Sequence, residues 1–443
     1  MEALNVFHKY SSALENSTLS KDIGKVVGVS GLLLRGYVPG CSIGSVCEIQ
    51  SLLGRSSCLA EVVGFDGQEA MLMALGSMQG LGLGSKIILQ KNNATVAAGK
   101  ALLGRVVNGL GEPIDGLAKL SLVDEVPLYN QAESPLDREI INSVLSVGVR
   151  AIDGLLTIGR GQRMAIMAGS GVGKSVLLGQ MARSTTADIN VIALIGERGR
   201  EVKEFIEHSL GHEGLKRSVV VAVTSDQSPL VRMRGAYLAT AIAEYFAKLN
   251  NHVLLMMDSV TRFAMAQREI GLSVGEPPAS KGYTPSVFSN LPKLLERAGN
   301  FSGHGSITGL YTVLVEGDDM DEPIADAVRS IVDGHIVLDR KIAQRGHYPA
   351  IDVLQSVSRV MRNIIPSHQN KLAQYIRENL AVYRDAEDLI NIGAYKSGAN
   401  PKIDRAIQII DRVNDFLKQD IEESSTFDQT QQFLSALSGG SRK

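Results

Sequence analysis

The chain has 443 residues, of which 44% are hydrophobic and 21% are charged, and 45 Lys and Arg stand against 47 Asp and Glu. This composition excludes a wholly disordered chain, and the net charge of −2 excludes a strongly basic nucleic-acid-binding coat. At about 150 residues per domain, the length suggests about three structural units. Cys41, Cys47 and Cys58 lack paired metal-type spacing and predict reduced thiols, and no apolar run approaches the roughly 20 residues of a membrane span, so we expect a cytoplasmic protein.

The first part of the chain predicts a short helix and then a small β-barrel. Apolar residues at positions 3, 7, 10 and 14 form one stripe of an amphipathic helix, which we place in residues 1–20. Residues 21–95 contain short β-rich runs broken by Gly and Pro, a texture that suits a barrel domain. These runs are Lys25–Val29, Ser45–Ile49, Leu59–Val63, Ala70–Leu75 and Lys86–Leu89.

The central and C-terminal parts predict an α/β domain at 96–362 and an α-helical domain at 363–443. Apolar runs such as Val191–Ile195 and Val253–Met257 lack in–out alternation and are separated by helical stretches. Strands of this kind indicate a parallel sheet covered by helices on both faces. After Met361 the apolar residues recur with helical period and no strand is expected. The predicted fold class is therefore α/β, with a barrel before it and helices after it.

A glycine-rich segment carries the strongest functional signal. Residues Ala168 to Ser175 read Ala-Gly-Ser-Gly-Val-Gly-Lys-Ser, after an apolar run and before a helical pattern. This context is typical of a phosphate-binding loop, although Ala168 replaces the first glycine of the strict pattern; the alternative is a glycine-rich turn that binds nothing. Backbone N–H groups and a helix N-terminus hold phosphate, Lys174 reaches the outer phosphates, and the Ser175 hydroxyl binds Mg²⁺. The predicted nucleotide-binding residues here are Gly169, Ser170, Gly171, Val172, Gly173, Lys174, Ser175 and Val176.

An acidic residue follows the apolar run that ends at Met257. In open α/β sheets, ligands bind outside the carboxyl ends of the strands, so Asp258 is predicted to lie at the nucleotide site. A carboxylate there holds the nucleotide-bound Mg²⁺. The alternative is a helix cap, because Ser259 and a helical pattern follow.

A second acidic residue follows the run that ends at Ile195. We expect Glu197 to lie one strand over from the phosphate loop, where it suits a base that orients and polarises the attacking water. Arg198 beside it is predicted to meet the terminal phosphate. The alternative is a surface ion pair with Arg200 or Lys203.

Two further residues are candidates near the end of the sheet region. Tyr348 lies on a Pro-containing turn and offers a stacking face for adenine; the alternative is ordinary packing. Arg359 is a candidate arginine finger, which stabilises charge on the transferring phosphoryl group and is often supplied by another subunit. The alternative for Arg359 is a solvated surface arginine.

Together these blocks closely resemble the flagellar and type III protein-export ATPases, which are relatives of the catalytic subunit of rotary ATP synthases. The resemblance runs from about Gly24 to about Gly398 and is far more specific than a lone phosphate loop. Besides the loop, the matching blocks are Gly196-Glu-Arg-Gly-Arg-Glu-Val, Met257-Asp-Ser-Val-Thr-Arg-Phe-Ala-Met-Ala-Gln-Arg-Glu, Gly275-Glu-Pro-Pro-Ala-Ser-Lys-Gly-Tyr and Gly346-His-Tyr-Pro-Ala-Ile-Asp.

The resemblance implies a barrel, a RecA-like nucleotide domain and a helical C-terminal domain, assembled as a homo-hexameric ring with ATP at the subunit interfaces. It also implies a role for each matching residue: phosphate binding for Lys174, Mg²⁺ binding for Ser175 and Asp258, the general base for Glu197, contact with the terminal phosphate for Arg198, adenine stacking for Tyr348, and a finger donated across the interface for Arg359. In the non-catalytic subunits of the synthases the acid matching Glu197 is absent, so this chain is expected to hydrolyse ATP.

The resemblance implies partners as well. In such systems the N-terminal helix docks a stator-like regulator, a coiled-coil stalk protein enters the ring, and the C-terminal domain meets export substrates and chaperones. The membrane export gate is reached indirectly, which implies a cytoplasmic protein at the inner-membrane export apparatus. No nucleic-acid partner is expected. The blocks from Leu102 to Gly111 and from Met164 to Gly169 resemble flagellar members more than injectisome members.

Three rival functions remain open at this stage. A catalytic subunit of a rotary ATP synthase is disfavoured because its C-terminal acidic lever motif is not evident. A RecA-like nucleic-acid translocase needs a basic, aromatic-bearing path, which a net charge of −2, no Trp and 5% aromatic residues argue against. A scaffold that binds ATP without turnover is disfavoured by Glu197.

Overall fold

The computed structural model describes residues 23–52, 54, 56–315, 317 and 319–438. The helix predicted for residues 1–20 lies outside this part of the chain. The described chain forms two compact units, one extending to Thr95 together with Ile270–Glu276 and the other comprising Val96–Glu269 and the chain from Pro277. None of the described helices is long and apolar enough to cross a membrane.

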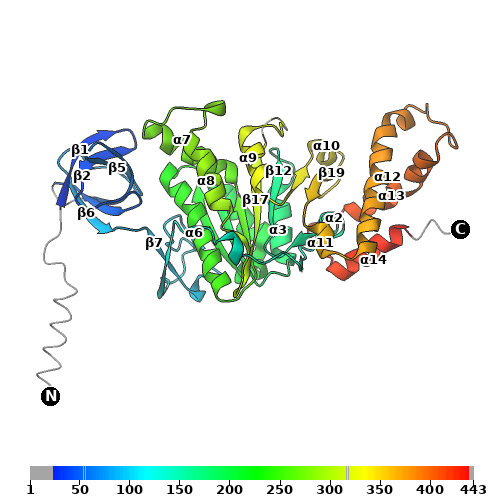
Figure 1. Cartoon of the computed structure of the whole chain (residues 1–443), viewed down its shortest axis with the longest axis horizontal. Helices are drawn as coiled ribbons and strands as arrows, with labels where there is room; N and C mark the ends of the chain where they lie inside the picture. The colour runs from blue at the N-terminus through cyan, green and yellow to red at the C-terminus, as the bar shows by residue number, and fades with distance from the viewer. Residues whose placement is uncertain (1–22, 53, 55, 316, 318, 439–443) are drawn as a thin grey trace, which may run out of the picture. The chain divides into compact units, whose positions relative to one another are not determined.

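The first unit contains a closed barrel with strand order β1-β2-β5-β4-β3-β6 (Figure 1). The strands are β1 (Ile23–Ser30), β2 (Leu33–Tyr37), β3 (Val46–Gln50), β4 (Ser57–Asp66), β5 (Glu69–Ala74) and β6 (Lys86–Lys91). Alternate side chains such as Val26, Ile49 and Leu72 point inward and are buried. The barrel prediction is confirmed, although the sequence analysis missed β2. Gly36 interrupts the β-rich run of that strand. Glycine is required there because a Cβ would lie 2.3 Å from the Lys25 carbonyl oxygen.

The second unit is built on a nine-stranded sheet in the order β19-β18-β12-β17-β15-β13-β14-β8, with β16 paired to β17. The strands are β8 (Val106–Val107), β12 (Arg163–Ala168), β13 (Ile189–Glu197), β14 (Ser218–Thr224), β15 (Val253–Asp258), β16 (Gly299–Asn300), β17 (Ser306–Leu314), β18 (Gly334–Leu338) and β19 (Ile351–Ser358). Most pairs are parallel, but β19 and β16 run antiparallel to their neighbours. The sequence predicted a parallel sheet, and the sheet is mixed instead. An antiparallel edge strand is common in such sheets, because a strand at the edge is free to reverse.

Helices flank this sheet, as the alternation of runs predicted (Figure 1). They include α3 (Lys174–Ser184), α6 (Pro229–Lys248), α7 (Val260–Ser273), α8 (Pro285–Leu295) and α9 (Pro323–Ile331). The longest of these, α6, begins with Pro at its first position and with a Ser228 hydroxyl that accepts the Val231 N–H. Both features are strong signals for the start of a helix. The buried face of α6 packs against the sheet.

The C-terminal part is helical, as predicted, and it shares a core with the sheet. It comprises α11 (Met361–Ile364), α12 (Ser367–Asn391), α13 (Pro401–Leu417) and α14 (Phe427–Ser438). Phe416 and Leu434 belong to the same buried cluster as Ile152 of the short helix α2 (Arg150–Leu155) and Met164 of β12. The C-terminal helices therefore pack in the same core as the sheet that carries the phosphate loop.

A buried ion pair ties α12 to strand β19. Arg384 donates two hydrogen bonds to Asp352, at 2.9 Å and 3.1 Å, and the Asp352 side chain is 2% exposed. Burial alone raises the pKa of Asp352, but the hydrogen bonds and charge of Arg384, with Gln355, outweigh burial and hold the pKa below its ordinary value. Arg384 is thus the largest single contributor to the stabilisation of the charged carboxylate.

We expect Arg384→Gln to lower the free energy of unfolding by about 1–2 kcal/mol at neutral pH, at the lower end for a charged hydrogen bond because solvent screens Arg384. A depressed acid pKa contributes stability above the unfolded pKa of about 3.9, and this contribution is lost as pH falls through the folded pKa. The difference between variant and wild type should therefore close below about pH 4. Urea unfolding at several pH values measures it. Arg345→Gln, which breaks the more exposed pair with Glu387, is the control and should cost less; a pH-independent difference would contradict the assignment.

Candidate functional site

The phosphate loop lies between β12 and α3. Strand β12 ends at Ala168 and helix α3 begins at Lys174. Gly171 and Gly173 have φ angles of 79° and 90°, a left-handed conformation that other residues rarely adopt. Glycine at these positions lets the chain turn tightly into the N-terminus of α3, where free N–H groups and the helix dipole favour an anion.

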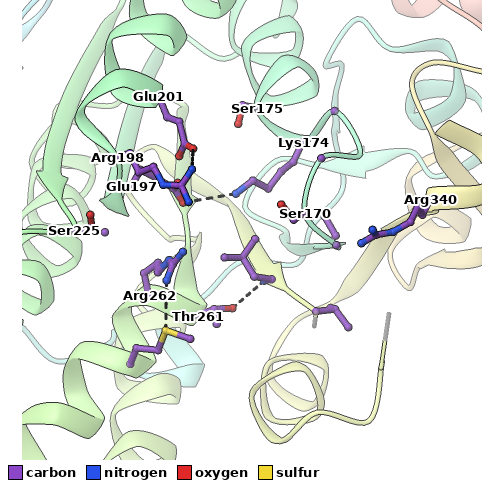
Figure 2. A pocket seen from close by; sticks show the side chains of 18 of the residues that line it. Ser170, Lys174, Ser175, Glu197, Arg198, Glu201, Ser225, Thr261, Arg262 and Arg340 are labelled. Carbon is purple, nitrogen blue, oxygen red and sulfur yellow. Dashed lines mark hydrogen bonds and ion pairs between the residues drawn. The ribbon is translucent and has the colours of Figure 1, made fainter. Parts of the chain in front are cut away.

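Lys174 joins the loop to both predicted carboxylates. Its Nζ forms an ion pair with Asp258 Oδ1 and lies 3.8 Å from Glu197 Oε1, towards which Figure 2 shows it directed. The side chains of Lys174, Asp258 and Glu197 are 12%, 4% and 15% exposed. The structure therefore brings together three residues that the sequence placed on separate elements.

The order of the strands differs from the sequence prediction for Glu197. This residue was expected one strand over from the loop, but β17 and β15 separate β13 from β12. The prediction is wrong because β17 is far later in the sequence and inserts beside β12, so neighbours in sequence are not neighbours in the sheet. The Lys174 side chain nevertheless spans this distance to Glu197.

Strand β17 also supplies a residue that the sequence analysis missed. The Thr312 hydroxyl lies 2.8 Å from Asp258 Oδ1 and donates to it. Both side chains are buried, with Thr312 on the strand next to the one that ends in Asp258. Thr312 therefore orients the carboxylate, and only the adjacency of β15 and β17 reveals this.

Glu197 has the electrostatic character of a group that can take up a proton near neutral pH. Burial raises the pKa of Glu197 to about 7, with a further increase from the charge of Asp258, while Lys174 opposes both. Its Oε1 is buried and accepts no hydrogen bond from the described residues. Such an oxygen is free to accept a hydrogen bond from a bound water.

A cavity of about 800 Å³ opens at the phosphate loop, and arginines line it (Figure 2). Arg198 is largely exposed and lies 3.4 Å from Glu201. Arg262 packs beside Gly196, and a Cβ added to Gly196 would lie 2.9 Å from the Cβ of Arg262. Arg340 lines the cavity on the side of Ser170. Positive charge around a glycine-rich loop suits a polyphosphate.

Glu201, Arg262 and Arg340 were not singled out from the sequence. Glu201 follows Glu197 by four residues, and Arg262 follows Asp258 by four, so one helical turn after each strand end was the available signal. Arg340 begins helix α10 (Arg340–Gln344), two residues after β18 ends at Leu338, so the carboxyl end of that strand was the available signal for it.

A second cavity, of about 470 Å³, lies on the other side of the loop and contains Tyr348. A Cβ on Gly173 would lie 3.5 Å from the Tyr348 ring, which therefore stands beside the loop as the stacking prediction requires. The cavity is also lined by Lys418, Gln419, Asp420 and Ile421, and the Gln419 N–H donates to the Tyr348 carbonyl oxygen at 2.9 Å. The sequence analysis missed these four residues because they follow α13, some 240 residues after the loop.

Arg359 is separate from both cavities. It is exposed, follows β19, and donates its backbone N–H to the Asp333 carbonyl at 3.0 Å. Neither cavity of its own chain includes it in the lining. The structure thus leaves Arg359 free on the surface, which a residue acting on another subunit's nucleotide requires.

Comparisons with known proteins agree with this architecture. Residues 148–358 match the nucleotide-binding domain of the ATP synthase alpha/beta family, and residues 365–436 match the C-terminal domain of the type III secretion ATPase EscN. The flagellum-specific ATP synthase of Treponema pallidum is 50% identical over 99% of this chain and 98% of its own. The type 3 secretion system ATPase of Xanthomonas euvesicatoria is 49% identical over 96% of each.

A solved structure of an assembled relative is also similar to this chain. The assembled ATPase EscN in complex with its central stalk EscO, from the enteropathogenic E. coli type III secretion system, has 44% identity and a TM-score of 0.87. The match covers 94% of this chain and 99% of the other. The identity along nearly the whole length, the two family matches and the phosphate-loop cavity together show that the chain belongs to the family of flagellum-specific ATP synthases and type III secretion ATPases.

Proposed function

We propose that this chain hydrolyses ATP to energise protein export by a flagellar type III secretion apparatus. The observation that carries the proposal is the meeting of Lys174, Asp258 and Glu197 at a glycine-rich loop, beside a cavity that arginines line. This is the set of groups that phosphoryl transfer needs: a phosphate cradle, a metal-holding acid and a group that positions water.

We assign phosphate binding to the loop residues Gly169–Val176, with the Lys174 ammonium on the outer phosphates. Mg²⁺ fits the donor set, since Ser175 and Asp258 offer hard oxygen ligands, and Mg²⁺ is commonly held by one or two carboxylates together with substrate phosphates. A cation, the Lys174 ammonium, already lies at Asp258. Ser175 and Asp258 would hold this metal, which would neutralise charge on the phosphates, and Lys174 would bind the outer phosphates.

Glu197 acts as the base in this assignment. Its Oε1, which accepts no hydrogen bond from the described residues, accepts one from the attacking water and orients this water towards the terminal phosphate. Arg198, whose side chain is 82% exposed and lines the cavity, contacts the terminal phosphate in this assignment. Tyr348 stacks on adenine, and Arg359 of a neighbouring subunit stabilises the charge of the transition state.

We further propose a homo-hexameric ring with a coiled-coil stalk protein in its pore. The likeness to an assembled relative solved with its central stalk supports both. By the same family resemblance, the N-terminal segment 1–20 docks a stator-like regulator, and the C-terminal domain meets export substrates and chaperones. The chain then works in the cytoplasm, peripherally at the inner membrane, and reaches the export gate indirectly.

We retain the division into residues 1–20, a barrel at 21–95, an ATPase domain at 96–362 and a helical domain at 363–443. The matched ranges 148–358 and 365–436 support a boundary near 363. The shared core of α2 and α13 means that this boundary is one of chain order rather than of separate packing.

The second candidate is an injectisome ATPase, which the 49% identity to a type 3 secretion ATPase keeps in view. Deleting the gene in its native cell separates the two: loss of hook and filament subunits from the medium, with loss of motility, supports the flagellar role. Intact motility with lost effector export favours the injectisome. Wild type should restore export, whereas Lys174→Ala should not; restoration by Lys174→Ala would contradict export driven by hydrolysis.

A further inference from the structure

One buried polar side chain lines the second cavity. Gln180 lies on α3, is 3% exposed and forms part of the wall between the phosphate loop and residues 418–421. Under the proposed function, on which this inference rests, Tyr348 and this wall enclose the base of the nucleotide. A buried amide at the base is a candidate reader of its identity.

The orientation of the Gln180 amide follows from its partners. Its Nε2 donates to the carbonyl oxygens of Asp420 and Glu423, at 3.2 Å and 3.0 Å. Carbonyl oxygens only accept, so the nitrogen must face them and the oxygen must face the other way. No described residue donates a hydrogen bond to Oε1. Because Oε1 is not among the fully buried polar atoms that lack a partner, this oxygen retains contact with solvent.

The other polar side chains of this wall are less suited to the task. Gln419 is buried, but its amide is fully used: Nε2 donates to the carbonyls of Gly148 and Glu423, and Oε1 accepts the Arg150 N–H. Lys418 and Asp420 are exposed, so water competes for their charged groups. Gln180 is the buried group with an acceptor left over.

We propose that Gln180 selects a 6-aminopurine base. Its Oε1 accepts a hydrogen bond from the 6-amino group of adenine, which presents a donor. Guanine presents a carbonyl oxygen at the same position, and two acceptors facing each other in a shielded site repel. The residue is thus a specificity determinant of the nucleotide, fixed in orientation by the segment Lys418–Ser425, which we call the C-terminal strap.

Steady-state hydrolysis of ATP and of purine riboside 5′-triphosphate, which lacks only the 6-amino group, tests this. Wild type should prefer ATP by about 3- to 12-fold in kcat/KM, the effect of one neutral hydrogen bond. In Gln180→Met the two substrates should be used equally, and the preference for ATP over GTP should narrow. A wild-type ratio near one would overturn the proposal without any variant.

Arg183→Met is the matched control. Arg183 is also on α3 and donates to the strap, at Ile421 O (2.7 Å), but does not line the cavity. This variant loosens the strap while leaving Gln180 Oε1 in place. The kcat/KM values for both substrates should therefore fall together, and their ratio should stay as in wild type. Loss of the ratio in Arg183→Met would assign the effect to strap packing and overturn the reading role. Hydrolysis of neither substrate by wild type would instead refute the proposed ATPase function.

Discussion

Replacing Arg359 with Ala is expected to reduce ATP hydrolysis by about 10³- to 10⁵-fold in assembled rings, while nucleotide still binds. In the proposed ring this arginine acts on the nucleotide of a neighbouring subunit, and its exposed position outside both cavities of its own chain is consistent with that role. Its loss removes charge stabilisation that develops only in the transition state, which leaves ground-state binding intact. Turnover and nucleotide affinity, measured on the same ring preparation, separate these effects.

Mixing tests whether Arg359 acts in trans. Arg359→Ala subunits keep an intact loop, and Lys174→Ala subunits keep an intact arginine, so some interfaces of a mixed ring pair both and should regain activity. Arg362→Ala, a nearby exposed arginine on α11, is the control and should hydrolyse ATP normally. Absence of rescue in rings shown to be mixed, with specific activity that does not depend on dilution, would make Arg359 a local structural residue.

Glu197→Gln is expected to lower hydrolysis by about 10²- to 10⁴-fold, the range typical of losing general-base catalysis. Gln keeps the size of the side chain but cannot take up a proton, and the phosphate contacts of the loop are unchanged. ATP binding should therefore persist, which nucleotide titration of the variant measures. Removing the Glu197 charge should leave the fold intact, since the Lys174 ammonium keeps its ion pair with Asp258.

Glu204→Gln provides the comparison for this prediction. It removes an acid from α4 (Gly199–Glu204), just after the same strand, but one whose partner is the exposed Arg200 at 2.7 Å. Its turnover should stay close to wild type, because an exposed ion pair contributes little. Near-normal hydrolysis by Glu197→Gln would exclude Glu197 as the base and direct attention to another group of the cavity.

Features that depend on short stretches of chain could be predicted from the sequence alone. The loop from Ala168 to Ser175 is recognisable because a tight turn into a helix N-terminus demands glycine, Lys and Ser in a fixed order. Asp258 and Glu197 were found because buried parallel strands are apolar until they end, and an acid there stands at the ligand-binding edge. The helical period after Met361 likewise predicted the C-terminal helices.

Which of these elements lie next to one another is seen only in the tertiary structure. It placed β17 and β15 between the loop strand and Glu197, set Thr312 beside Asp258, and brought Arg340 to the cavity. It also placed the C-terminal strap beside α3, where the carbonyl oxygens of Asp420 and Glu423 accept hydrogen bonds from the Gln180 amide nitrogen. Strand order and such packing join residues tens to hundreds of positions apart, and local periodicity carries no record of contacts made over those separations.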